Sequence, residues 1–247
     1  MMWKRHTLVD ISDAGRKSLL ATMMSEECDR RISFRQASEL LLPEFAGARI
    51  PGIVRRADVV LPADAVAVGF SGLCVGPAGR PRLAATIDIA NIVNVLSPYA
   101  LMALPISGRT RSLWALQAAE ELSKRLGLRL GVWGSAALEV CTGLPYTHQE
   151  SDLDLLVAPA SLDVLMNFLE DIYSLEKRFS VRIDVELDLA DGYGVQLKEL
   201  MGSGRMILGK SLADVALLSR EHICSQLPES SDMVGHPERF CDAKLNF

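Results

Sequence analysis

Residues 153–189 hold the pattern that most constrains the fold, namely two strand-like runs separated by one amphipathic helix. The run LDLLVA at 153–158 is mostly apolar, as buried strands are, and ends before a proline. From Ser161 to about Glu176, apolar residues recur at helical spacing behind a serine suited to cap the helix. The run VRIDVELDL at 181–189 alternates strictly. This order predicts two neighbouring strands of one sheet, joined by a helix that packs on it.

The segments on either side extend this prediction to an α+β protein. We expect, in chain order, β-like runs at 52–56, 65–73 and 82–89, a helix from Thr110 to Leu126 that ends at Gly127, a strand at 128–133, a short helix at 136–142, a loop at 143–151, and a hairpin strand at 193–200 after the Asp191-Gly192 turn. We therefore predict an N-terminal mixed α/β region at 1–108. A second domain at 109–247 would hold a mixed sheet flanked by helices.

The overall charge limits the partners that the chain can attract. Of its 247 residues, 31 are acidic and 26 are Lys or Arg, so the formal net charge is −5 and no global positive field favours long nucleic acid. Neither a secretion signal nor an apolar run of membrane-spanning length is present, so we expect no membrane partner. The cysteines are scattered without zinc-site spacing, and we expect reduced thiols in a cytoplasmic protein. They are Cys28, Cys74, Cys141, Cys224 and Cys241.

Two aspartates one residue apart, Asp152 and Asp154, suggest the chemistry. Successive side chains of a strand point to opposite faces, so these two carboxylates share a face. A divalent cation such as Mg²⁺ relieves the repulsion of such a pair and also binds substrate phosphates. Asp184 or Glu186, on one face of the next strand, can supply a third carboxylate. The pattern predicts phosphoryl or nucleotidyl transfer.

Upstream of this pair, Gly134 and Ser135 join a strand to a helix. A glycine there lets the backbone approach a phosphate, and free N–H groups with a hydroxyl can hold it. Further substrate-binding candidates lie in the loop that follows and among basic side chains at element ends. These are Thr142, Gly143, Tyr146 and Ser151 in the loop, and Arg55, Arg56 and Lys210 elsewhere.

The order of a Gly-Ser, an Asp-x-Asp strand, a helix and a second acidic strand resembles the nucleotidyltransferase superfamily over about residues 110–220. The longer form GSAALEVCTGLPYTHQESDLDLL is similar to the malonate decarboxylase holo-acyl-carrier-protein synthases, the phosphoribosyl-dephospho-CoA transferase family. RHTLVDI at 5–11, IPGIVRR at 50–56 and VAVGF at 66–70 resemble the opening elements of the same family, so the likeness covers nearly the whole chain.

The resemblance implies a catalytic nucleotidyltransferase-like domain at 109–247 and an accessory, substrate-recognition domain before it. It implies transfer of 2′-(5″-phosphoribosyl)-3′-dephospho-CoA from triphosphoribosyl-dephospho-CoA to a serine of the acyl carrier subunit of malonate decarboxylase, with release of pyrophosphate. Asp152, Asp154 and Asp184 would hold Mg²⁺ or Mn²⁺. A carrier of acidic character would need a local basic patch. Candidates for this patch are Arg109, Arg111, Lys124, Arg125 and Arg129.

Two other classes share the same residues. A nucleotidyltransferase with a different hydroxyl acceptor would keep the same catalytic set. A non-catalytic binding module of this fold would be expected to lose a carboxylate or the Gly-Ser pair, and this chain keeps all of them.

Overall fold

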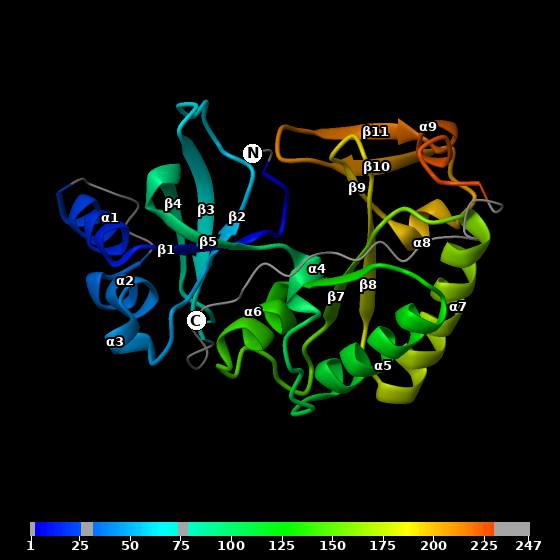
Figure 1. Cartoon of the computed structure of the whole chain (residues 1–247), viewed down its shortest axis with the longest axis horizontal. Coiled ribbons are helices and arrows are strands. Elements are labelled where there is room, and N and C mark those ends of the chain that lie inside the picture. Colours follow the sequence, from blue (N-terminus) through cyan, green and yellow to red (C-terminus); the bar gives the residue numbers. More distant parts are fainter. Residues whose placement is uncertain (1–2, 26–31, 74–78, 230–247) are drawn as a thin grey trace.

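The computed structural model describes residues 3–25, 32–73 and 79–229. Their strands form two sheets, which lie side by side along the long axis of the molecule (Figure 1). One sheet has the strand order β4-β3-β2-β1-β5 and the other has the order β11-β10-β9-β8-β7-β6. Helices pack on both sheets, so the α+β class predicted from the sequence is confirmed.

The N-terminal sheet is antiparallel throughout. Its strands are β1 (Leu8–Ile11), β2 (Gly52–Val54), β3 (Ala65–Ser71), β4 (Arg82–Asp88) and β5 (Ile92–Leu96), with a short 3-10 turn, η2 (Ile89–Asn91), before β5. The three β-like runs predicted here are β2, β3 and β4. No individual helix was predicted in this region, whereas the structure has α1 (Asp13–Ser25), α2 (Phe34–Leu41) and α3 (Pro43–Ala46). These helices lie beside the sheet in blue in Figure 1.

The C-terminal sheet is mixed, as predicted, because β7 and β8 are parallel while its other pairs are antiparallel. Its strands are β6 (Leu130–Trp133), β7 (Leu153–Val157), β8 (Ile183–Asp188), β9 (Gly194–Gln196), β10 (Met206–Lys210) and β11 (Val215–Ser219). Helices α5 (Arg111–Arg125) and α7 (Leu162–Phe179) pack on one face of this sheet and on each other. The shorter helices are α4 (Pro98–Leu101), α6 (Gly134–Thr142), α8 (Leu197–Leu200) and α9 (Arg220–Cys224).

Three local predictions need correction. Helix α7 runs to Phe179, beyond the predicted end at Glu176, and Ser161 occupies the cap position without a capping hydrogen bond from its side chain. The predicted strand at 193–200 is strand only at β9. Its second half forms α8, in which Leu197 and Leu200 are both fully buried. Residues three positions apart lie on the same side of a helix but on opposite faces of a strand, so the helical turn buries both on one side.

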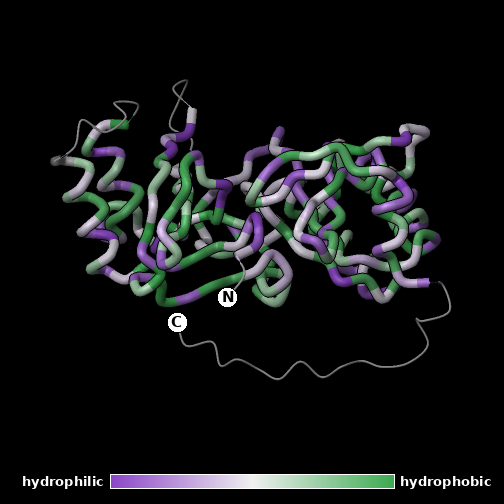
Figure 2. The backbone as a smooth tube through the Cα atoms, turned by 90° about the horizontal axis from the view of Figure 1, so that it is seen from above, coloured by the Kyte–Doolittle hydropathy of each residue, from purple (hydrophilic) through white to green (hydrophobic). Residues whose placement is uncertain are grey.

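Two groups of buried apolar side chains form the core. The larger lies between the C-terminal sheet and α5 and α7, and the smaller lies between the N-terminal sheet and α1 and α2. Green, apolar stretches of backbone run through both halves in Figure 2. No helix within the described residues is long and apolar enough to cross a membrane. Cys141 and Cys224 are free thiols, as predicted. Cys28, Cys74 and Cys241 lie outside the described residues.

Candidate active site

Acidic side chains gather on one face of β7 and β8. In the parallel register, Asp154 is the direct neighbour of Asp184, and Leu156 is the neighbour of Glu186. Registered neighbours share a face of the sheet about 5 Å apart. The intervening residues of both strands are fully buried toward the helices. They are Leu153, Leu155, Ile183, Val185 and Leu187. The alternation therefore leaves the acidic side chains on the face turned away from α5 and α7.

The charges of this acidic group perturb one another. Burial, together with the nearby carboxylates of Asp184 and Asp152, raises the pKa of Asp154 to about 6. Arg182 supplies the opposing charge, since its Nη2 donates to Asp184 Oδ2 at 2.5 Å and its Nη1 lies 3.9 Å from Asp152 Oδ2. Asp152 itself precedes β7 and is half exposed. The ionised form of Asp154 is therefore destabilised by the negative charges around it.

A divalent cation would relieve this crowding, and carboxylate oxygens are the ligands that Mg²⁺ and Mn²⁺ favour. The donor chemistry of Asp152, Asp154 and Asp184 fits such an ion. Over residues 3–25, 32–73 and 79–229, no three His, Cys, Asp or Glu side chains converge as a preformed metal site. In this arrangement the guanidinium of Arg182 faces two of the three acids.

Glu186, the other candidate for a third carboxylate, is engaged elsewhere. It is only 4% exposed, and its Oε1 lies 2.7 Å from Arg5 Nη1 and 3.4 Å from His6 Nε2. Burial opposes its ionisation, but the hydrogen bonds and charges of His6 and Arg5 lower its pKa overall. Its charge is therefore matched by the N-terminal segment, while Asp184 stands directly beside Asp154.

Gly134 begins α6 where β6 ends, and its geometry explains why a glycine stands there. Its φ of +70° is costly for other residues, and a Cβ would collide with the carboxylate of Asp154. The next residue, Ser135, accepts a hydrogen bond of 2.7 Å at its Oγ from Arg80 Nη1. Arg80 Nη2 also donates to the carbonyl of Tyr146. The Gly-Ser pair thus lies between an acid of the C-terminal sheet and a base of the N-terminal region.

These groups line one cavity of about 520 Å³ between the two sheets, here called the arginine-lined cavity. From the C-terminal side it is lined by Trp133, Gly134, Ser135, Leu138 and Asp154. From the N-terminal side it receives Arg55, Arg80 and Arg82, among smaller and apolar side chains of β2, β3 and β4. Its size is typical of a small-molecule site. Arginines beside a Gly-Ser turn suit phosphate oxygens.

Of the three basic residues predicted to bind substrate, only Arg55 lines this cavity. Arg55 lines the cavity and pairs with the exposed Asp58 at 2.5 Å. Arg56, the next residue, is exposed and outside the cavity lining. Lys210 is also outside, and it is its backbone carbonyl that accepts a hydrogen bond from Arg5. A phosphate-binding role for Arg56 and Lys210 stays a prediction without a place in this cavity.

The four loop candidates shape the path from α6 to β7. Thr142 Oγ1 donates to the carbonyl of Leu138, and Gly143 adopts the left-handed conformation that ends α6. Tyr146 is buried and donates its hydroxyl to the carbonyl of Ser71 in β3. Ser151 Oγ accepts from the backbone N–H of His148. All four lie outside the cavity lining, so their substrate roles also stay predictions.

Several functional candidates escaped the sequence analysis. Arg182 could have been found, because it falls on the same face of the alternating run as Asp184. Arg80 and Arg82 belong to an Arg-Pro-Arg group whose last residue begins β4, and this group carries no motif of its own. Trp133, the last residue of β6, stacks on His6 with ring centroids 4.0 Å apart. Only the fold brings Arg80, Arg82 and Trp133 to the site.

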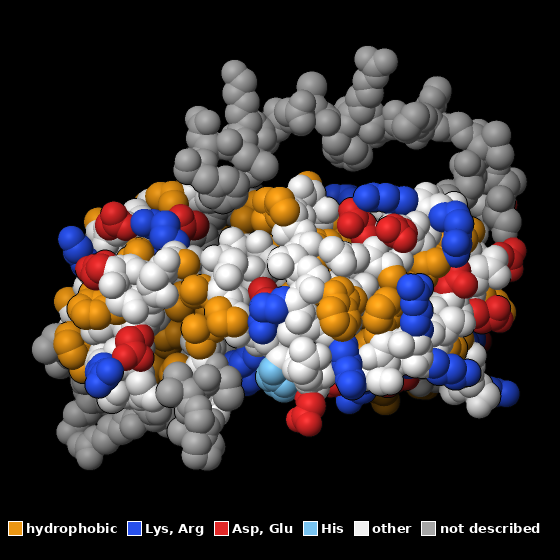
Figure 3. All heavy atoms as spheres, turned by 90° about the horizontal axis from the view of Figure 1, so that it is seen from below, with side chains coloured by type: hydrophobic (Ala, Val, Ile, Leu, Met, Phe, Trp, Pro, Cys, Tyr) orange, Lys and Arg blue, Asp and Glu red, His pale blue; other side chains and the backbone are white. Residues whose placement is uncertain are grey.

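The predicted basic patch for a carrier is largely engaged within the chain. Arg109 pairs with Glu139, Lys124 with Glu120 and Arg125 with Asp171, while Arg129 lies over the ring of Tyr99. Figure 3 views the underside of the molecule, where Lys and Arg side chains are spread among acidic and apolar ones. The Lys and Arg side chains visible on this face do not form one concentrated patch.

Fold and site together define a class: an α+β protein with a cavity, between two sheets, that is lined by three arginines on one side and by a carboxylate and a Gly-Ser turn on the other. Two family models match the chain, the phosphoribosyl-dephospho-CoA transferase MdcG N-terminal domain over residues 4–98 and its C-terminal domain over residues 101–221. The chain therefore belongs to the phosphoribosyl-dephospho-CoA transferase MdcG family, which confirms the resemblance inferred from its motifs.

Similar proteins carry the same name. A phosphoribosyl-dephospho-CoA transferase from Bradyrhizobium diazoefficiens is 33% identical over 90% of this chain and 92% of its own length. That of Xanthomonas axonopodis pv. citri is 31% identical over 72% of this chain and 83% of its own. That of Pseudomonas aeruginosa is 34% identical over 68% and 81%. No solved structure matches the chain. The family models meet near residue 100, and the domain boundary at 108/109 stays a prediction.

Proposed function

We propose that this protein transfers 2′-(5″-phosphoribosyl)-3′-dephospho-CoA from its triphosphate precursor to a serine of the acyl carrier subunit of malonate decarboxylase, and releases pyrophosphate. The observation that carries the proposal is the arginine-lined cavity, where Arg80 contacts Ser135 within reach of the acidic face of β7 and β8. Relatives named phosphoribosyl-dephospho-CoA transferase support the class of substrate. The substrate and carrier of this reaction are expected in the cytoplasm.

The cavity suits the triphosphate of the precursor. Arg55, Arg80 and Arg82 offer planar donors that match phosphate oxygens. Ser135 and the backbone N–H groups at the start of α6 are placed to hold the leaving pyrophosphate. Arg80 is already oriented by its two contacts on the C-terminal side, so little ordering is required when the substrate binds.

Asp152, Asp154 and Asp184 would hold Mg²⁺ or Mn²⁺, which supplies charge neutralisation at the transferring phosphate when bound. In the transfer, the serine Oγ of the carrier forms a bond to the α-phosphorus while the bond from that phosphorus to pyrophosphate breaks. The hydroxyl proton passes to a carboxylate, for which we propose Asp184 rather than Glu186. The reason is that Asp184 is the registered neighbour of Asp154, whereas Glu186 is buried beside Leu156 and paired with Arg5 and His6.

Intact-protein mass spectrometry of the apo carrier subunit tests the proposal. With the enzyme, Mg²⁺ and the triphosphate precursor, one serine should gain the whole phosphoribosyl-dephospho-CoA unit, and free pyrophosphate should appear in equal amount. Asp184→Ala should bind the precursor and fail to transfer it. Added mass with Glu186→Gln but not with Asp184→Ala would support the choice of third carboxylate.

Two other outcomes would each replace the proposal. No added mass on the carrier, together with nucleotide transfer from ATP to another hydroxyl, would identify a nucleotidyltransferase with a different acceptor. Binding of the precursor without any transfer under all metal conditions would identify a non-catalytic binding module.

A further inference from the structure

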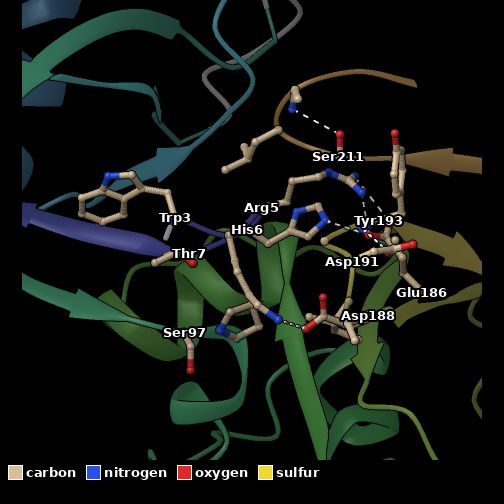
Figure 4. A pocket seen from close by; sticks show the side chains of 18 of the residues that line it. Trp3, Arg5, His6, Thr7, Ser97, Glu186, Asp188, Asp191, Tyr193 and Ser211 are labelled. Carbon is tan, nitrogen blue, oxygen red and sulfur yellow. Dashed lines mark hydrogen bonds and ion pairs between the residues drawn. The ribbon is translucent and has the colours of Figure 1, made fainter. Parts of the chain in front are cut away.

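A second cavity, of about 660 Å³, lies between the two sheets and is here called the aromatic cavity. Three aromatic side chains, Trp3, Tyr99 and Tyr193, line it together with apolar residues from both regions. Figure 4 shows Trp3 on the side of the N-terminal sheet and Tyr193 on the opposite side, near the strands of the C-terminal sheet. The turns from β8 to β9 and from β10 to β11 complete its rim.

The carboxylates that line the aromatic cavity already have partners within the protein. Glu186 binds Arg5 and His6, Asp188 binds Lys4 and Tyr99, Asp191 binds His222 and Gln226, and Asp214 binds Tyr193 and Ser211. The basic groups of the lining, Lys4, Arg5 and His6, are the partners of two of these acids. A phosphate here would have to break such pairs. An uncharged ligand would not.

The aromatic cavity adjoins the arginine-lined cavity. Asp154 lines the arginine-lined cavity and Leu156 lines the aromatic cavity. These residues are two positions apart on the same face of β7. That spacing corresponds to about 7 Å along a strand. Trp133 and His6, which stack at 4.0 Å, belong to the arginine-lined and the aromatic cavity respectively. The stacked pair therefore forms the partition between two chambers that share one sheet face.

We propose that the aromatic cavity binds the pantetheine arm of the dephospho-CoA unit, while the triphosphate of the precursor occupies the arginine-lined cavity. This inference rests on the proposed function and assigns a second subsite to it. The arm is an extended chain of methylenes and uncharged amides, so it can bury apolar surface against the aromatic rings without needing a counter-charge. One of its amide carbonyls can accept from the hydroxyl of Ser97, which also lines the cavity.

Binding measurements with two small-molecule probes separate the contribution of the pantetheine arm to affinity. Dephospho-CoA carries the pantetheine arm, whereas ADP has the same adenosine and pyrophosphate without it. Isothermal titration calorimetry should give a Kd for dephospho-CoA at least about tenfold below that for ADP, which equals about 1.4 kcal/mol. The ratio of the two Kd values is the measure of the arm's contribution, and it is independent of phosphate binding common to both probes.

Two exposed alanines on the cavity rim allow the cavity to be filled with little risk to the core. Ala190 lies in the turn after β8 and Ala213 lies in the turn after β10. In Ala190→Trp and Ala213→Trp the Kd ratio should fall to near one, with ADP binding unchanged. Val215→Trp is the matched control, since Val215 is exposed on β11 and outside the lining. It should keep the wild-type ratio.

Three results would overturn the inference. Equal Kd values for the two probes in the wild-type protein would show that the arm makes no contact. An unchanged, wild-type Kd ratio in both Ala190→Trp and Ala213→Trp would place the arm elsewhere. A raised KM for the carrier in these variants, with an unchanged Kd ratio, would show that the carrier occupies the cavity instead. In Ala84→Trp, which fills the arginine-lined cavity, the KM for the triphosphate precursor should rise while the Kd ratio of the two probes keeps its wild-type value, and an unchanged KM would count against the proposed function alone.

Discussion

Replacing Asp154 with Asn should stabilise the fold and abolish transfer. In the folded protein, burial and the adjacent carboxylates raise the pKa of Asp154 from 3.8 to about 6. At about 1.4 kcal/mol for each tenfold change in acid dissociation, this interval corresponds to about 3 kcal/mol. A group with a raised acid pKa binds its proton more tightly when folded, so the penalty is absent below pH 3.8 and complete above about pH 6. Asp154→Asn removes the charge and hence the penalty.

Urea unfolding of both proteins between pH 4 and pH 8 measures this effect. At pH 4 the two free energies of unfolding should be similar. By pH 7 the Asn variant should be more stable by up to about 3 kcal/mol, because other titrating groups affect both proteins alike and cancel in the difference. Transfer to the proposed carrier should fall by at least about a hundredfold if Asp154 is a ligand of the proposed metal ion.

A difference in stability that does not change with pH would refute the electrostatic reasoning, and so would an Asn variant that is less stable than the wild type at pH 8. Added Mg²⁺ provides a second comparison. It should raise the melting temperature of the wild type more than that of the Asn variant, since a bound ion stabilises the folded state in proportion to its affinity. Equal shifts in both proteins would show that Asp154 does not contribute to cation binding.

Three further predictions concern the surroundings of this carboxylate. Gly134→Val should lose transfer and lower the melting temperature, whereas Gly134→Ala should do so less, because both place a Cβ against the partly buried Asp154 carboxylate at positive φ but only valine is branched; unchanged kinetics in the valine variant would contradict this. Arg80→Ala should raise the KM for the triphosphate precursor by about tenfold or more, and Arg80→Lys should recover only part of it, as steady-state kinetics would show. Arg5→Ala should cost about 3 kcal/mol in urea unfolding by leaving Glu186 buried with less compensation, while removal of the exposed Arg35 should cost less than about 1 kcal/mol. Equal costs would indicate that the Arg5 pair is solvated.

The N-terminal helices show how a local signal can be missed. Helix α2 starts with a reciprocal cap, in which Ser33 Oγ accepts from Gln36 N–H and the Gln36 side chain accepts from Ser33 N–H. The spacing of a serine and a glutamine three residues later was visible in the sequence. The turn after β9 was harder to predict, because Leu197 and Leu200 suit either an extended or a helical segment until the neighbouring surfaces are known.

The sequence by itself determined the acidic face and the Gly-Ser turn beside it. Strand alternation is a property of consecutive residues, so it placed Asp154 and the acids of β8 on common faces, and the family motif followed from the same stretch. The tertiary structure decided what meets those groups. Arg80 reaches Ser135 across 55 positions and Arg5 reaches Glu186 across 181, and such contacts depend on which surfaces of two sheets face each other. No periodicity along the chain encodes that docking, because it results from the packing of the two halves.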